Sequence, residues 1–278
     1  MIKVELPAVL PAEIIAWQER AQEISQEILQ AQTLQEKRDI IDRYQRHWRK
    51  PELVNWLSDI NFEKCWFTET KFGGDYQEVE HIRPKKGTKE ADGTACANHP
   101  GYYWLAFDLS NYRLCKRRTN AKKGTFFPIL DNRLRANQPQ HSWRDERPLF
   151  LDPLKDADVI LLSFNDNGAP VPQEGIHQVD QDRVNFTIEK YFLDERILNK
   201  RRAETWSTVR CLYNEYLNAS MEANDQGSVA KATEAEQKLI QVKDMCRKNA
   251  EFSSVAIESL MKLPDRTAWT IASRASAT

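Results

Sequence analysis

An acid and a histidine end a predicted strand, and two asparagines follow at distances that could bring all four side chains to one site. The pair Glu80-His81 closes the alternating segment 76 to 80. Asn111 precedes a second predicted strand, and Asn120 stands where the next helix is expected to begin. A neutral imidazole can deprotonate water near neutral pH, and carboxylate and amide oxygens suit Mg²⁺. These residue types fit metal-assisted hydrolysis of a phosphodiester, although a lone acid-histidine pair is more often structural.

Basic residues are concentrated around these four side chains. The 43 residues from 81 to 123 contain ten basic and three acidic residues, a net charge of +7, whereas the whole chain carries −1. Such asymmetry is expected of a surface that meets phosphates, although a charge run is usually a solvated face. The expected nucleic-acid contacts are Arg83, Lys85, Arg113, Lys116, Arg117, Arg118, Lys122 and Lys123, and His81 is expected to be partly exposed in this basic groove.

The N-terminal region, residues 1 to 60, is predicted to be helical. Apolar residues at spacings of three and four indicate a helix over residues 12 to 31. Thr33 followed by Glu36 is a capping-box signature for a second helix, and Pro51 suits the first position of a third. Residues 61 to 130 then hold the two short strands, a long loop and a helix that begins near Asn120.

The rest of the chain is predicted to be an irregular connection followed by helices. Residues 131 to 190 are rich in Pro and Asp, with a possible buried strand over 159 to 164 and a turn over 165 to 168. Residues 191 to 278 repeat apolar residues at helical spacing and end in a frayed tail from Ser273. The expected fold class is α+β and mostly helical.

The composition limits the class of protein. With 278 residues, 29% of them charged and 41% hydrophobic, the chain has a globular composition and ample length for a core. It lacks an apolar stretch that could span a bilayer and a signal-peptide apolar core, which favours a cytoplasmic location without membrane association. Five scattered cysteines, with no Cys-x-x-Cys, favour reduced thiols over a disulfide framework.

Three segments, VEHIRPKKG, HPGYYWLAFDLSN and TNAKKGTFFP, closely resemble the HNH (ββα-metal) endonuclease family. The likeness continues through RPLFLDPLKDADVILLSF and FTIEKYFLDERILNKRR, and it covers about residues 62 to 202. It points to the bacterial branch that includes the HNH subunit of Septu-type anti-phage defence systems, which works with an ATPase subunit. The resemblance implies a ββα-metal nuclease unit in residues 61 to 130, between N-terminal helices and a C-terminal helical bundle.

The family assigns roles to the matching residues. The resemblance implies that His81 is the general base and that Asn120 and Glu80 bind the metal. It implies that Asn111 orients the loop and the base. Lys123 matches the lysine of the closing Asn-x-x-Lys pattern. The resemblance also implies a divalent metal cofactor, most simply Mg²⁺. The substrate that it implies is nucleic acid, with DNA favoured over RNA, and the products would have 5′-phosphate and 3′-hydroxyl ends.

The chain departs from the family at the structural zinc site. Many relatives have two Cys-x-x-Cys pairs, whereas here Cys65 is followed by Thr68, and Lys116 and Thr119 hold the second pair's positions. Cys115 is one residue out of register, so we expect no structural zinc. Aromatic packing is expected to replace it, through Trp66, Phe67, Tyr102, Tyr103, Trp104 and Phe107.

Two other functions remain open at this point. One is a non-catalytic nucleic-acid- or partner-binding scaffold on a degenerate HNH fold, and the other is an effector that cleaves RNA. The flanking helices could dock a protein subunit or simply complete one hydrophobic core. Of the other histidines, His47, His141 and His177 are expected at the surface or at caps, and His99 at a loop.

Overall fold

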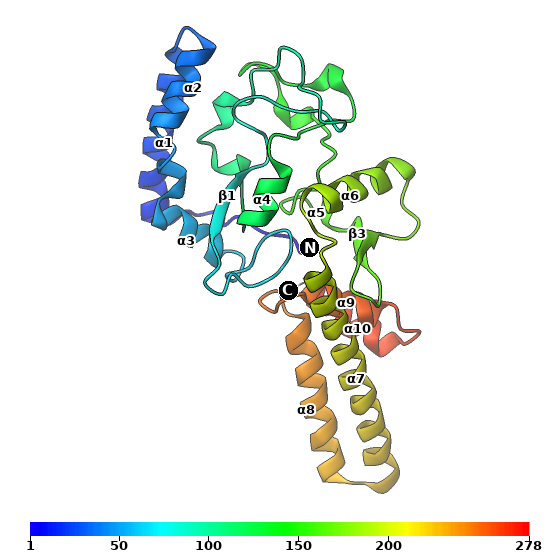
Figure 1. Cartoon of the computed structure of the whole chain (residues 1–278). Helices are drawn as coiled ribbons and strands as arrows, with labels where there is room; N and C mark the ends of the chain where they lie inside the picture. The colour runs from blue at the N-terminus through cyan, green and yellow to red at the C-terminus, as the bar shows by residue number, and fades with distance from the viewer. Residues whose placement is uncertain (278) are drawn as a thin grey trace.

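The computed structural model describes residues 1–277 and shows an α+β fold dominated by helices, which confirms the expected class (Figure 1). Its helices are α1 (Ala12–Gln30), α2 (Leu34–Arg43), α3 (Pro51–Asp59), α4 (Arg117–Lys123), α5 (Asp156–Val159), α6 (Gln178–Lys190), α7 (Arg196–Gln226), α8 (Val229–Cys246), α9 (Ser253–Met261) and α10 (Arg266–Ala277). Two antiparallel pairs of short strands complete it: β1 (Gln77–His81) with β2 (Tyr112–Lys116), and β3 (Leu162–Phe164) with β4 (Pro170–Pro172).

The N-terminal helices form as their sequence signals predict. Helix α1 buries one stripe, which consists of Ile14, Trp17, Ala21, Ile24 and Ile28. At the start of α2, the Thr33 hydroxyl accepts from the Glu36 backbone N–H and the Glu36 carboxylate accepts from that of Thr33, so the predicted capping box is present. Pro51 is the first residue of α3.

Strands β1 and β2 and helix α4 form a ββα unit in the middle of the molecule (Figure 1). In the strand pair, Gln77 lies opposite Lys116 and His81 lies opposite Tyr112. Helix α4 follows β2 directly and begins at Arg117, three residues before the expected start. The expectation failed because Asn120 does not cap the helix: its amide donates to the Glu78 carboxylate instead.

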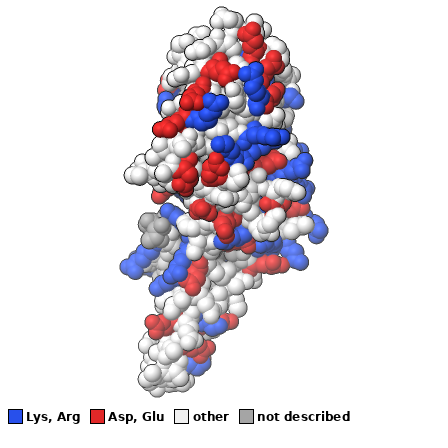
Figure 2. Space-filling view, turned by 90° about the vertical axis from the view of Figure 1, so that its left-hand side faces the viewer, with Lys and Arg blue, Asp and Glu red and all other residues white. Residues whose placement is uncertain are grey.

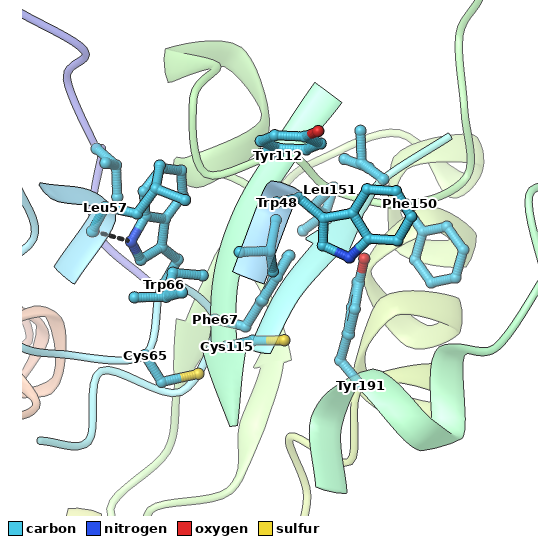
Figure 3. Packing of buried hydrophobic residues seen from close by; sticks show 14 of the residues in the cluster. Trp48, Leu57, Cys65, Trp66, Phe67, Tyr112, Cys115, Phe150, Leu151 and Tyr191 are labelled. Atoms are coloured by element: carbon cyan, nitrogen blue, oxygen red, sulfur yellow. Dashed lines mark hydrogen bonds between the residues drawn. The ribbon is translucent and has the colours of Figure 1, made fainter. Parts of the chain in front are cut away.

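One hydrophobic core joins the N-terminal helices to the ββα unit. Trp17 of α1 packs edge-on against Tyr112 of β2, and Trp66 donates its indole N–H to the Leu57 carbonyl of α3 at 3.1 Å (Figure 3). Phe67 stacks on Tyr191 with ring centroids 4.0 Å apart. The N-terminal helices therefore complete the core of the ββα unit, which is one of the two roles considered for the flanking helices.

Helices α7 and α8 form a long hairpin that extends away from this core (Figure 1). A second cluster of buried residues joins the hairpin to α9 and α10, and it includes Val209, Tyr213, Val242, Cys246 and Leu260. A frayed tail was expected from Ser273, but α10 continues to Ala277, so this expectation is wrong for the described residues. Thr278 lies outside the described residues.

The connecting region is more ordered than its composition suggested. Helix α6 begins at Gln178, inside the region predicted to be irregular. The single strand expected over 159 to 164 is instead the end of α5 followed by β3, and Gly168 allows the predicted turn with a φ of 74°. No helix in the part of the chain that the structure describes is long and apolar enough to cross a membrane.

Candidate functional site

A small cavity at the end of β1 brings together most of the residues for which chemistry was predicted. Its volume is about 220 Å³. Glu80 and His81 contribute from β1 and Asn120 from α4, and the loop that follows β1 adds Lys85 and Lys86. Asn111 is not among the lining residues. The strand pair and the helix thus place an acid, a histidine, an amide and two lysines around one space.

Glu80 is buried and paired with a lysine. Its side chain faces α4, where the Lys123 ammonium lies 2.6 Å from Oε1. The ammonium gives this oxygen a short, charge-assisted contact, although its angle departs from that of an ideal hydrogen bond. Burial raises the pKa of Glu80, and the neighbouring Lys123 opposes that shift. The carboxylate is therefore held in a dry setting by one cation.

His81 was expected to be partly exposed in a basic groove, and this expectation is wrong. Its ring is only 5% exposed because Trp48 and Tyr112 pack edge-on against it, with ring centroids 4.9 and 5.0 Å away. Burial lowers the pKa of His81 well below its usual range, and the charge of Lys85 adds to the effect. The imidazole is accordingly neutral near pH 7.

The hydrogen bonds of His81 fix which ring nitrogen can accept a proton. Nε2 lies 2.9 Å from the Ala106 carbonyl oxygen, and because a carbonyl can only accept, Nε2 carries the hydrogen. Nδ1 is then the acceptor of the ring, and the Lys85 ammonium donates to it at 3.4 Å. His81 and Lys85 both line the cavity, so their contact lies beside it. The ring is held as the tautomer that a general base requires.

Lys85 is the cation nearest to this nitrogen. Its ammonium also lies 4.9 Å from the centroid of the Trp48 ring, a cation–π contact. Burial lowers the pKa of Lys85 to about 8, while Glu80 opposes the shift. The side chain is still mostly protonated at pH 7, which places a positive charge at the mouth of the cavity beside the acceptor nitrogen.

Asn111 connects the loop after β1 to the start of β2. Its Oδ1 accepts from the Arg83 backbone N–H at 2.9 Å, and its Nδ2 donates to the carbonyls of Arg83 and Leu105. Leu105 immediately precedes Ala106, the residue whose carbonyl holds His81. The contacts are therefore compatible with the predicted role of Asn111 in orienting the loop and the base, and that role stays a prediction.

Sequence reasoning missed Glu78 as a member of this site. Asn120 donates to the Glu78 carboxylate at 2.6 Å, and Glu80 pairs with Lys123 one turn further along α4. Residues two apart on a strand share a face, as do residues three apart on a helix. The spacing of the two glutamates was therefore a signal that could have identified Glu78.

Three of the predicted phosphate contacts lie inside the protein. Arg83 donates to Glu146 at 2.8 Å, and Arg113 makes two hydrogen bonds to Asp152 at 2.7 and 2.6 Å. Lys123 is fully buried and also donates to the carbonyls of His81 and Ile82. The expectation that these three cations form part of a basic surface is corrected, because each is neutralised by a buried carboxylate.

The other predicted basic contacts reach the surface to different degrees. Arg117, Arg118 and Lys122 are exposed, whereas Lys85 and Lys116 are partly buried. On the face shown in Figure 2, Lys and Arg side chains are mixed with Asp and Glu, and neither sign covers it alone. Nucleic-acid binding by these five side chains stays a prediction.

Two other histidines are buried within the structure. His47 was expected at the surface, and this is wrong: its ring stacks on Trp17 with centroids 4.6 Å apart and its Nε2 bonds to the Trp17 carbonyl. His99 holds a loop, as expected, because its Nδ1 accepts from the Gly101 backbone N–H. His141 and His177 are exposed.

The oxygen donors around the cavity fit a hard divalent cation. Among residues 1–277, no three His, Cys, Asp or Glu side chains gather as a metal site. Mg²⁺, however, keeps several waters and needs only one or two carboxylates. The Glu80 carboxylate and the amide oxygen of Asn120, whose nitrogen is already engaged by Glu78, belong to residues that border the same cavity.

We expect the purified protein to contain no stoichiometric zinc. Cys65 and Cys115 are buried free thiols, and the remaining family positions are filled by Thr68, Lys116 and Thr119. Burial raises the pKa of Cys115 well above its usual range, which disfavours the thiolate that zinc needs. Elemental analysis after purification without added metal checks this. One zinc per chain would contradict it.

Together these features define an α+β protein whose ββα unit brings an acid, a histidine and an amide to one cavity. No family model matches the chain. The chain is similar to Septu protein PtuB of Bacillus mycoides (strain KBAB4), with 31% identity over 159 residues. The alignment covers 56% of this chain and 52% of the relative, so the chain spans about half the length of the curated protein it matches.

Proposed function

We propose that this protein is a metal-dependent endonuclease of the HNH type that hydrolyses phosphodiester bonds of nucleic acid, with DNA the favoured substrate. The observation that carries the proposal is the state of His81: a neutral ring, with Nε2 fixed on the Ala106 carbonyl and Nδ1 beside the cavity that holds Glu80 and Asn120. At Nδ1 the ring accepts from the Lys85 ammonium at 3.4 Å, a contact that a substrate phosphate would draw away.

In this mechanism, Nδ1 of His81 accepts a proton from the water that attacks phosphorus. The Ala106 carbonyl holds the ring in place and stabilises the imidazolium that forms, because it accepts from Nε2. Asn111 fixes the loop that contains Leu105 and so positions this carbonyl. The Lys85 ammonium, which donates to Nδ1 at 3.4 Å, would move from this nitrogen to the substrate phosphate. There it would supply positive charge, and the attacking water would take its place at Nδ1.

Glu80 and Asn120 would hold the divalent cation. When bound, such a cation neutralises the charge that builds on the phosphate and the departing oxygen. Lys123 keeps the Glu80 carboxylate in place through its ion pair and through its bonds to the carbonyls of His81 and Ile82. The family resemblance supports these assignments, since it covers each of these positions.

A second candidate is a non-catalytic scaffold on the same fold. The tight burial of the Glu80–Lys123 pair favours it, because a buried carboxylate neutralised by lysine can also serve structure alone. The two candidates differ in a simple assay, described next.

The proposal is tested by incubating the purified chain with plasmid, single-stranded DNA and total RNA, in Mg²⁺ and in chelator. We expect cleavage of at least the DNA substrates in Mg²⁺ and its loss in chelator. Cleavage confined to RNA would keep the chemistry and change the substrate. Binding without cleavage in any divalent cation would favour the scaffold.

We also propose that the nuclease acts in anti-phage defence beside an ATPase subunit. Similarity to a Septu protein over about half the chain supports this context. A nuclease of low sequence specificity must be restrained in its own cell, and control by a partner meets that need. Phage plating on cells that express the chain with and without the ATPase subunit of a Septu-type system tests the role, with His81→Ala as the inactive control.

A further inference from the structure

A second, larger groove lies at the other end of α4. Its volume is about 610 Å³, and it runs between the start of α4 and the start of α7. Helix α4 has seven residues, and it lines both spaces: Arg117, Arg118, Thr119 and Ala121 border the groove, and Asn120 borders the candidate catalytic cavity. The two spaces share one helix as a common wall, with Arg117 and Arg118 at one end and Asn120 facing the catalytic cavity.

Four cations line this groove, from two elements far apart in sequence. Lys116, Arg117 and Arg118 come from the junction of β2 and α4, and Arg201 comes from α7. Two carboxylates, Asp75 and Glu195, are also in the lining, so positive charge is in excess. The lining residues alone carry a net charge of +2, and two carboxylates outside the lining, Glu78 and Glu251, pair with Arg117 and Arg201.

Arg117 and Arg118 are only loosely held by carboxylates, whereas Arg201 donates to Glu251 at 2.6 Å and Lys116 lies 3.3 Å from Asp75. The nitrogen of Arg117 lies 3.8 Å from Glu78, and that of Arg118 lies 3.9 Å from Glu195, beyond hydrogen-bond distance. Their side chains are 72% and 67% exposed. Exposed pairs of this kind contribute little to stability, and the guanidinium groups keep their donors available for an incoming anion.

The same groove has an aromatic side chain without a core to fill. Tyr76 is 76% exposed, although it directly precedes β1. On the opposite wall, Arg118 and Lys122 lie over the ring of Phe192, at 4.9 and 4.6 Å from its centroid. Exposed aromatic rings beside cations are what proteins use to stack bases of single strands while tracking the phosphates.

We propose that this groove binds a single-stranded stretch of the nucleic acid on which the catalytic cavity acts, with the backbone on Lys116, Arg117 and Arg118 and a base on Tyr76. The inference rests on the proposed function. Residues of α4 line both spaces. A strand along α4 can thus occupy both, and the groove would hold the strand in place for cleavage.

The test measures binding of a fluorescent single-stranded oligonucleotide in chelator, so that no cleavage occurs. Replacing Lys116, Arg117 and Arg118 by alanine should weaken binding and reduce the slope of log affinity against log salt by about 0.7 per lost contact. The control replaces Arg133, Lys200 and Arg247, which are exposed and also lie beside carboxylates. It should leave the slope unchanged.

Tyr76→Ala tests the stacking part separately. Loss of one stacked base should weaken binding of the single strand about 5- to 150-fold, and binding of a blunt duplex much less. Equal losses for both substrates would overturn the assignment to a single strand.

The experiments distinguish an incorrect groove proposal from an incorrect proposed function. If wild-type protein cleaves nucleic acid but the triple variant keeps its affinity and salt slope, the groove proposal is overturned and the nuclease stands. If the triple variant keeps its slope but loses a protein subunit in a pull-down, the basic run is a docking surface, which also overturns it. Thermal unfolding of each variant verifies that it remains folded.

Discussion

His81→Ala is expected to abolish nucleic-acid cleavage in Mg²⁺ while leaving nucleic-acid binding near normal. General-base catalysis contributes about 10²- to 10⁴-fold to a rate, so the cleavage rate of the variant should be lower than that of the wild type by this factor. The remaining cavity residues cannot replace the base, because Lys85 is mostly protonated near pH 7 and Glu80 is paired with Lys123. Single-turnover cleavage with enzyme in excess measures the effect.

Burial of His81 calls for a second variant and a matched control. The alanine leaves a space between Trp48 and Tyr112, so His81→Gln should be measured beside it because it fills more of that space. His141→Ala removes an exposed histidine and should change nothing. If a folded His81 variant kept most of the wild-type rate, the assignment of the base would be wrong.

The largest expected effect on stability comes from Asp152→Ala. This carboxylate accepts two hydrogen bonds from Arg113 and one from the Leu154 backbone N–H, and both partners of the ion pair are buried. Its removal leaves the Arg113 guanidinium uncompensated in the core, which costs about 3–5 kcal/mol. Equilibrium unfolding in urea should register this loss of unfolding free energy.

The matched control is Asp131→Ala, because Asp131 also accepts hydrogen bonds from an arginine, Arg133, but at the surface. Solvent screens that pair, and its loss should barely move the midpoint of unfolding. Similar effects of the two substitutions would contradict the buried position of Arg113, and would return this arginine to the predicted nucleic-acid surface.

Local signals made the N-terminal helices and the ββα unit predictable. The Thr33–Glu36 capping box, Pro51 at a helix start and the alternating residues before His81 each act through neighbours in the chain. The start of α4 was missed because its first turn is rich in basic residues and has no side-chain cap. Its position is set by contacts of Asn120 and Lys123 with β1, which no local pattern records.

The fate of the basic residues was the least predictable part of the site. Arg83 and Arg113 look like surface cations in the sequence, but their partners Glu146 and Asp152 follow 63 and 39 residues later. Only the folded chain brings such pairs together. The residue types at the cavity could be predicted from the sequence, since the acid, the histidine and Asn120 do line one space. Their burial could not.

The most direct test of the central claim is an analysis of the ends produced when the purified protein cuts a labelled nucleic acid in Mg²⁺. In the proposed mechanism, the water that His81 deprotonates attacks phosphorus and the bond to the 3′ oxygen breaks, which leaves a 5′-phosphate and a 3′-hydroxyl on every cut. We therefore expect the new 5′ ends to be ligatable without prior phosphorylation, and to be absent in reactions with His81→Ala. Cuts that leave 5′-hydroxyl ends, or 5′-phosphate ends that form equally with the variant, would contradict the account.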